Sequence, residues 1–164
     1  MFDLDQTLVN TSQIEHLRKN RQWHLIPEYL KSKCTSIYPS IDTTLEALHQ
    51  TGIKIAIVTS SPTQYAKLIL DYHNLPYDFV VGYHDVSQRK PSPEGMQKVL
   101  TYFQITHDQA ISFGDQYTDI LASNSISIQS VACLWGNINN QDLLNSTPSF
   151  VLSNSNEILR ILKI

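Results

Sequence analysis

Glycine and cysteine are scarce in this sequence, and each scarcity excludes a class of site. Five glycines occur among 164 residues, and neither a Gly-x-Gly-x-x-Gly pattern nor a P-loop is present, which disfavours the common nucleotide-binding loops. Cys34 and Cys133 are far apart and lack metal-ligand spacing, so reduced thiols in a cytoplasm are expected. The sequence shows no signal-peptide pattern and no apolar run long enough to cross a bilayer. We expect a cytoplasmic protein that does not enter a membrane.

Charge is also sparse, at 16% of residues, and the hydrophobic content of 41% is typical of a globular domain. The net charge of −3 argues against a globally basic nucleic-acid binder. Residues 10–39 differ from the rest because five basic and two acidic side chains give them a local charge of +3. The length suits one sizeable core. We therefore predict a single domain over residues 1–164, as a monomer or a weak dimer.

From about residue 40 the chain alternates apolar, strand-like segments with helix-like ones. The pattern predicts helices over 41–50, 62–74, 93–103 and 118–124, and strands over 53–59, 79–83, 110–113, 130–134 and 150–152. Ser61 and Ser92, each followed by proline, are expected as helix caps, and Asn154-x-x-Glu157 as the capping box of a last helix. Repeated strand–helix units predict an α/β fold, namely a Rossmann-like three-layer α/β/α parallel sheet.

Residues 10–39 interrupt this alternation, and we call them the cap segment. Ile14 and Leu17 indicate one helical face, and a second face is indicated by Leu25, Ile26, Tyr29 and Leu30. A stretch of this length accommodates at most two short helices. We predict a small helical cap that is inserted between the first strand and the first helix of the main repeat.

Polar side chains stand at the carboxyl ends of the predicted strands, where open α/β sheets place their ligand sites. They are Asp3 and Asp5, then Thr59 and Ser60, then Lys90, then Gly114-Asp115 with Asp119. Taken singly, each has an ordinary structural explanation as a turn, a cap or a solvated charge. Four such groups in this order, each at a strand end, indicate one shared site.

The order Asp-x-Asp-x-Thr, Thr-Ser, Lys-Pro-x-Pro and Gly-Asp-x-x-x-Asp resembles the haloacid dehalogenase (HAD) superfamily. Residues 131–136 are similar to its phosphoglycolate-phosphatase and β-phosphoglucomutase-like branch. The resemblance covers residues 2–8 and about 40–136. The combined motifs are highly specific for the superfamily and poorly specific for the substrate.

For the acidic residues, the resemblance implies phosphoryl transfer. Asp3 would be the nucleophile that forms an aspartyl-phosphate, and Asp5 would protonate the leaving oxygen and then accept a proton from the attacking water. The Asp3 carboxylate, the Asp5 backbone carbonyl and Asp115 would hold Mg²⁺, with Asp119 orienting these ligands from behind. Dehalogenases of the superfamily normally lack the second aspartate, because displacing a halide needs no proton donor. Asp5 therefore favours phosphate esters.

For the remaining positions, the resemblance implies contacts with the phosphate. Thr59 and the Ser60 amide would bind its oxygens beside a helix N-terminus, and Lys90 would offset the crowded negative charge. We expect a Mg²⁺-dependent phosphatase that acts on a small phosphorylated metabolite. Two alternatives stay open: a phosphatase on nucleic-acid ends or phosphoprotein, favoured by the small basic cap, and a catalytically weak binding or regulatory domain. A phosphomutase is disfavoured, because such enzymes need a cap that excludes water.

Two positions depart from the family pattern. Only Met1 and Phe2 precede Asp3, whereas several apolar residues are usual there. Either native residues are missing before Met1 or the central strand is very short, and we expect low stability or low activity of this form. Gln6 stands where glycine is usual, and its side chain is expected to crowd the phosphate or to contact the substrate.

Overall fold

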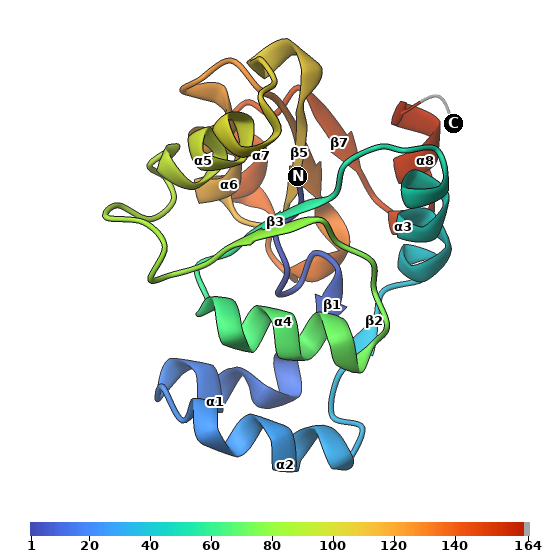
Figure 1. Cartoon of the computed structure of the whole chain (residues 1–164), viewed down its shortest axis with the longest axis vertical. Coiled ribbons are helices and arrows are strands. Elements are labelled where there is room, and N and C mark those ends of the chain that lie inside the picture. Colours follow the sequence, from blue (N-terminus) through green and yellow to red (C-terminus); the bar gives the residue numbers. More distant parts are fainter. Residues whose placement is uncertain (163–164) are drawn as a thin grey trace.

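A computed structural model describes residues 1–162 as a twisted parallel sheet with helices around it (Figure 1). The strands of this sheet are β3 (Ala56–Val58), β4 (Phe79–Val81), β5 (Ile111–Gly114), β6 (Gln129–Cys133) and β7 (Phe150–Leu152). Phe2 forms parallel bridges to Ile57 on one side and to Phe113 on the other, so the order is β4, β3, Phe2, β5, β6, β7. The predicted Rossmann-like α/β fold is confirmed, although β3 and β4 are shorter than expected.

Residues 1–3 occupy the centre of the sheet and are hydrogen-bonded on both sides. The Phe2 amide donates to the carbonyl of Ala56 at 2.8 Å, and the Asp3 amide donates to the carbonyl of Phe113 at 2.9 Å. The Phe2 ring is buried and stacks on that of Phe113 with 4.7 Å between centroids. This short strand therefore delivers Asp3 to the carboxyl edge of the sheet, beside the ends of β3 and β5.

Helices cover both faces of the sheet (Figure 1). The core helices are α3 (Ile41–Gln50), α4 (Thr63–Tyr72), α5 (Glu94–Phe103), α6 (Tyr117–Asn124), α7 (Gln141–Asn145) and α8 (Ile158–Leu162), with single 3₁₀ turns at His107–Gln109, Leu134–Gly136 and Ser155–Glu157. Apolar side chains of α3, α4 and α8 pack around Phe2 and Phe113, whereas those of α5 and α6 pack around Ala56 and Val81. Each face of the sheet thus has its own apolar core.

Two predicted helix caps are wrong. The N-caps of α4 and α5 are Pro62 and Pro93, so Ser61 and Ser92 lie one residue before the helix boundary. The Ser61 hydroxyl instead donates to Asp5 at 2.7 Å, which makes Ser61 part of the site. The capping box predicted from Asn154 is confirmed, and it begins the 3₁₀ turn that leads into α8.

The cap segment lies at one end of the molecule, beyond α4 (Figure 1). A two-stranded antiparallel ribbon, β1 (Val9–Asn10) and β2 (Ser36–Ile37), connects it to the core. Between these strands lie α1 (Glu15–Lys19) and α2 (Ile26–Lys31), each preceded by a 3₁₀ turn, at Ser12–Ile14 and Trp23–Leu25. Ile14, Leu17, Ile26 and Leu30 are buried and join the same apolar core as Tyr65 of α4. The cap segment is therefore packed onto α4.

Two further features bear on the expected environment of the chain. Cys34 and Cys133 are both free and buried. Within residues 1–162, every helix is too short or too polar to cross a bilayer.

Candidate active site

A cavity of about 460 Å³ opens at the carboxyl edge of the sheet, between the core and the cap segment. Every residue predicted for the site borders it: Asp3, Asp5, Thr59, Ser60, Lys90, Asp115 and Asp119. They come from the end of the central strand at Phe2, the end of β3, the loop after β4, the end of β5 and the first turn of α6. The structure therefore brings together side chains that are more than a hundred residues apart in the sequence.

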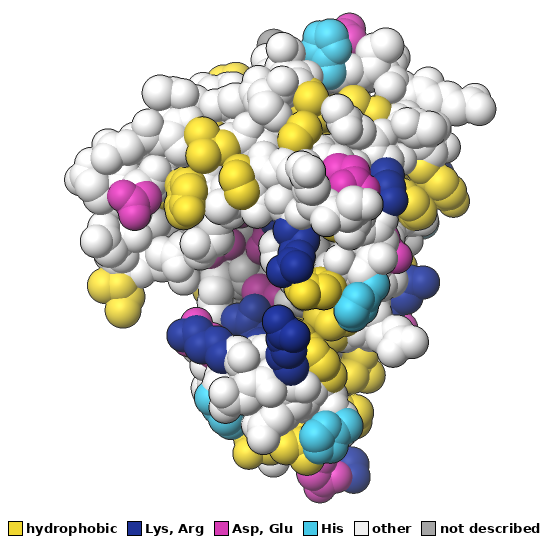
Figure 2. Space-filling model, turned by 90° about the vertical axis from the view of Figure 1, so that its left-hand side faces the viewer, with side chains coloured by type: hydrophobic (Ala, Val, Ile, Leu, Met, Phe, Trp, Pro, Cys, Tyr) yellow, Lys and Arg dark blue, Asp and Glu magenta, His cyan; other side chains and the backbone are white. Residues whose placement is uncertain are grey.

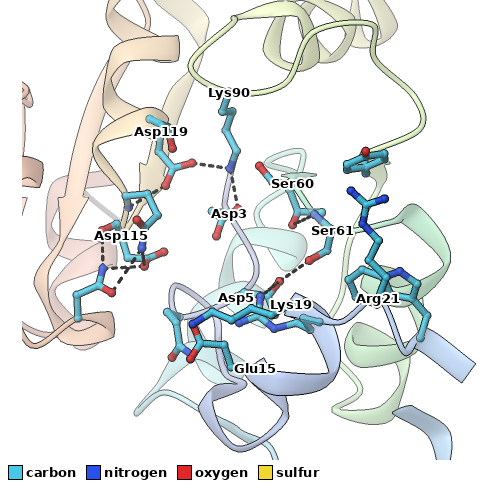
Figure 3. A pocket seen from close by; sticks show the side chains of 18 residues that line it. Asp3, Asp5, Glu15, Lys19, Arg21, Ser60, Ser61, Lys90, Asp115 and Asp119 are labelled. Atoms are coloured by element: carbon cyan, nitrogen blue, oxygen red, sulfur yellow. Dashed lines mark hydrogen bonds and ion pairs between the residues drawn. The ribbon is translucent and has the colours of Figure 1, made fainter. Parts of the chain in front are cut away.

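Three carboxylates form the floor of this cavity (Figure 3). One oxygen from each of Asp3, Asp115 and Asp119 lies within 4.8 Å of the others. Burial raises the pKa of Asp3 well above its ordinary value, and Lys90 opposes this rise, whereas Asp119 and Asp115 add to it. Burial and then the charge of Asp119 also raise the pKa of Asp115. The cluster therefore requires positive charge to remain ionised.

Lys90 supplies one such charge from the loop after β4. Its Nζ donates to Asp3 Oδ1 at 2.7 Å, to Asp119 Oδ1 at 2.5 Å and to the carbonyl of Val58 at 2.9 Å. The side chain is only 7% exposed. Burial alone would lower the pKa of Lys90, but Asp119 and Asp3 outweigh it and raise that pKa above its ordinary value. Lys90 is thus a charged bridge between the two aspartates (Figure 3).

The Asp115 carboxylate is held in place by neutral donors. Thr7 Oγ1 donates to Oδ1 at 2.9 Å, and the side-chain amides of Gln116 and Asn137 donate to Oδ2, each at 2.8 Å. Asp119 is tied down as well, since its Oδ2 accepts from the Gln116 backbone amide at 3.0 Å. Both carboxylates are fixed before any ligand arrives.

These residues fit a hard divalent cation. Three clustered carboxylates offer the oxygen ligands that Mg²⁺ takes in proteins, and the raised pKa values of Asp3 and Asp115 show that further positive charge would stabilise these two. The side chain of Asp5 is not part of the cluster, so Asp5 could contribute only its backbone carbonyl. Asp119, engaged by Lys90 and Gln116, is suited to orienting the other ligands.

Asp5 has entirely different surroundings from Asp3. Its Oδ1 accepts hydrogen bonds from Thr11 Oγ1 at 2.8 Å and from Tyr65 Oη at 2.7 Å. Its Oδ2 accepts one from Ser61 Oγ at 2.7 Å and lies 2.9 Å from Nη1 of Arg18. Figure 3 shows Asp5 turned toward Ser61, on the side of the cavity away from Asp119. The two aspartates of the motif are therefore separated into two environments.

Thr59 and Ser60 directly follow β3 and form part of the wall of the cavity. Thr59 is buried, and its Oγ1 accepts from the Ser61 amide at 3.1 Å, whereas Ser60 is exposed. α4 begins at Thr63, only a few residues further on. The unpaired amides of a first helical turn favour anions.

Two glycines allow the loops of the site to approach one another. A Cβ at Gly114 would overlap the carboxylate of Asp119, and a Cβ at Gly136 would overlap the backbone carbonyl of Gln6. Gln6 itself has a left-handed backbone with φ of 67°, and its Oε1 accepts from the Tyr38 hydroxyl at 2.8 Å. Gln6 borders the cavity, and its side chain is held by Tyr38, the residue that follows β2.

Several site residues were missed by the analysis of the sequence. They are Thr11, Arg18, Ser61, Tyr65, Gln116 and Asn137. Asp5 accepts hydrogen bonds from Ser61 and Tyr65, which are more than fifty residues away in the sequence. No local sequence pattern could have revealed these contacts. The basic character of the cap segment was the one signal that pointed to Arg18.

Basic side chains frame the acidic floor of the cavity. Arg18, Lys19 and Arg21 of the cap segment border it, and Figure 2 shows dark blue side chains gathered around a recess in which acidic ones are visible. Lys19 pairs with Glu15 at 3.0 Å on the exposed rim. The cap segment therefore offers positive charge to a ligand bound over Asp3.

Comparison with known proteins agrees with this geometry. A family model described as haloacid dehalogenase-like hydrolase matches residues 17–133, well over half of the chain. The chain belongs to the haloacid dehalogenase-like hydrolase family. The superfamily predicted from the four motifs is confirmed, and the enzyme class is that of a hydrolase.

Relatives of this HAD-like chain include proteins named phosphoglycolate phosphatase. One from Vibrio cholerae is 26% identical over 98% of this chain and 74% of its own length. One from Aquifex aeolicus is 32% identical over 78% of this chain and 60% of its own length. The chain spans between 57% and 74% of the first such relatives. A crystal structure of a predicted phosphoglycolate phosphatase from Haemophilus somnus superposes with a TM-score of 0.80 at 22% identity, over 98% of this chain and 96% of that one. At this identity the likeness shows the fold.

Proposed function

We propose that this HAD-like hydrolase cleaves phosphate monoesters through an aspartyl-phosphate on Asp3. The observation that carries the proposal is the position of Lys90, which bridges Asp3 and Asp119 within a cluster of three buried carboxylates at the floor of an open cavity. A nucleophilic carboxylate next to charge-neutralising groups is the arrangement that phosphoryl transfer requires.

In the first step, an oxygen of Asp3 attacks the phosphorus of the ester. The bond between phosphorus and the leaving oxygen breaks, and its electron pair stays on that oxygen. Asp5, which takes up a proton from solvent when the ester binds, donates this proton to the leaving oxygen. Thr59 and the Ser60 amide bind the phosphate oxygens at the wall of the cavity, and Lys90 holds Asp3 in line.

In the second step, a water molecule attacks the phosphorus of the aspartyl-phosphate. Asp5, now a carboxylate, takes a proton from this water, and the bond between phosphorus and Asp3 breaks. Inorganic phosphate leaves, Asp3 is again a carboxylate, and Asp5 returns its proton to solvent and is a carboxylate as well. The cycle therefore consumes one water molecule for each ester.

We further propose that Asp3, Asp115 and the backbone carbonyl of Asp5 hold Mg²⁺, with Asp119 orienting these ligands. When bound, the cation would neutralise phosphate charge and fix the phosphate opposite Asp3. Small phosphorylated metabolites are the proposed substrates, since the cavity of about 460 Å³ suits a small molecule. Phosphoglycolate is the first substrate to test, because relatives are named phosphoglycolate phosphatase.

A phosphatase assay with p-nitrophenyl phosphate and with phosphoglycolate tests the proposal. We expect turnover that needs Mg²⁺, is lost on chelation and falls at least about a thousandfold in Asp3→Asn, in which the nucleophile is removed. Asp42→Asn, which removes an exposed carboxylate from α3, should leave turnover unchanged. Activity that survives Asp3→Asn would reject the proposed nucleophile.

A further inference from the structure

We infer that Arg18 of the cap segment is a latch that holds Asp5 until an anionic group of the substrate replaces Asp5 on the guanidinium. The inference rests on the proposed phosphatase function, because it concerns the proton transfers assigned to Asp5. It makes Arg18 a positioning residue for Asp5 and a specificity-determining residue for the leaving group of the ester.

The first argument is the number of hydrogen bonds that Asp5 accepts. Each of its two oxygens contacts two donors: Thr11 and Tyr65 on Oδ1, Ser61 and Arg18 on Oδ2. A carboxylate has about four lone-pair sites in all. With all of them engaged, the leaving oxygen of an ester has no place on Asp5. One donor must leave before Asp5 can act.

The second argument identifies that donor. Thr11, Ser61 and Tyr65 are buried, although Ser61 also borders the cavity, and each carries a hydroxyl that can stay in place and rotate to accept a hydrogen bond. Arg18 can only donate. It belongs to the short helix α1 of the cap segment, its side chain is 17% exposed, and it borders the cavity. Arg18 is therefore the donor that can leave Asp5 and bind a ligand in the cavity.

The third argument is an unused donor on Arg18 itself. Its Nε is buried and has no hydrogen-bond partner within residues 1–162, and its contact with Asp5 uses Nη1. A guanidinium presents five donors in a planar fork that suits two oxygens of a carboxylate or phosphate. An oxyanion from the cavity can thus satisfy Arg18 more completely than Asp5 does.

The fourth argument is the charge around the latch. Lys19 and Arg21 border the same cavity. Lys19 already forms an ion pair with Glu15. An ester whose phosphate lies at Asp3, and whose leaving group carries a carboxylate or a second phosphate, places that second charge among these cations. Binding of such a substrate opens the latch, whereas an ester with a neutral leaving group leaves Arg18 on Asp5.

Two esters of similar size test the inference: phosphoglycolate, which carries a carboxylate, and 2-hydroxyethyl phosphate, which does not. We expect the unmodified chain to prefer phosphoglycolate in kcat/KM by about tenfold or more, the effect of one charge-assisted hydrogen bond. In Arg18→Ala, KM for phosphoglycolate should rise about tenfold, while kcat for 2-hydroxyethyl phosphate should rise because Asp5 is released. Arg18→Lys should retain part of the preference.

Lys31→Ala is the matched control, since it removes one cap charge that pairs with Glu28 away from the cavity; both esters should react as before. If Arg18→Ala lowers kcat for both esters by one factor and leaves KM unchanged, the latch is wrong. Thermal melting of each variant shows whether it folds. If Arg18→Ala does not fold, Arg18→Lys becomes the test, and an unchanged substrate preference in Arg18→Lys overturns the inference. If the unmodified chain hydrolyses neither ester, or if hydrolysis survives Asp3→Asn, the proposed function is wrong, and the inference that rests on it is rejected with it.

Discussion

Asp3 and Asp5 are two residues apart, yet they lie in opposite electrostatic surroundings. Asp3 faces two other carboxylates and a single lysine, all of which belong to the core. Asp5 faces donors only, and two of them, Thr11 and Arg18, come from the cap segment. We call these the core side and the cap side of the site.

This difference shows how one short motif supports two kinds of chemistry. The core side has too much negative charge, so it stabilises a cation or any group that neutralises Asp3. The cap side has as many donors as Asp5 can accept, so it stabilises a carboxylate that is held in place. A nucleophile and a proton carrier need such different surroundings.

The largest expected effect comes from removing the charge on the core side. Lys90→Met keeps the length of the buried side chain and leaves Asp3 and Asp119 without their shared partner. We expect kcat to fall about a hundredfold to a thousandfold and the free energy of unfolding to fall by about 3 kcal/mol. Urea unfolding with and without Mg²⁺ measures this, and Mg²⁺ should stabilise the variant more than the unmodified chain.

Lys54→Met is the control for that prediction, because the exposed Lys54 pairs with Asp78 on the surface at 2.9 Å. Its free energy of unfolding should change by less than about 1 kcal/mol. If Lys90→Met is no more destabilising than Lys54→Met, the carboxylates of the core side do not repel one another as proposed.

On the cap side, a smaller effect is expected from Tyr65→Phe, which removes one of the four donors to Asp5. Hydrogen bonds to charged groups contribute about 1.5–3 kcal/mol, so the free energy of unfolding should fall by about 2 kcal/mol. Since three donors remain, kcat should change only a few-fold. Urea unfolding and the phosphatase assay measure the two quantities.

Tyr72→Phe serves as the comparison, because the Tyr72 hydroxyl donates to the neutral carbonyl of Leu30 at 2.9 Å. We expect a loss of about 1 kcal/mol or less and unchanged turnover. Equal losses for the two tyrosines would mean that Asp5 carries no charge in the resting enzyme.

The core side could be predicted from the sequence, and most of the cap side could not. Asp3 and Asp115 stand at strand ends, Lys90 lies in the loop after β4 and Asp119 in the first turn of α6. The carboxyl ends of parallel strands meet at one edge of the sheet. Sequence order alone therefore brings them together. Ser61 was interpreted as a helix cap because a serine before proline is typical of a helix start, but the hydroxyl is used by Asp5 instead.

Cap-side contacts depend on how the cap segment packs onto α4, and this packing has no local signature. The apolar face of α1 and α2 predicted two short helices, which the structure contains. It could not specify that Arg18, on α1, would reach Asp5. A basic side chain on a short helix is more often solvated, and only the packed structure distinguishes the two cases.

The smallest expected effect concerns Gln6, which follows Asp5 in the chain and precedes β1. Its φ of 67° is left-handed, a conformation that glycine adopts without the cost of about 1–2 kcal/mol that other residues incur, while its Oε1 accepts from Tyr38. Gln6→Gly should therefore stabilise the fold by about 1 kcal/mol or less, because relieved backbone strain is partly offset by the lost hydrogen bond. Gln104→Gly, at the exposed left-handed end of α5 with φ of 55°, relieves similar strain and should stabilise the fold more. The difference between the two free energies of unfolding measures the hydrogen bond to Tyr38, and a large fall in kcat for Gln6→Gly would show instead that the Gln6 side chain takes part in substrate binding.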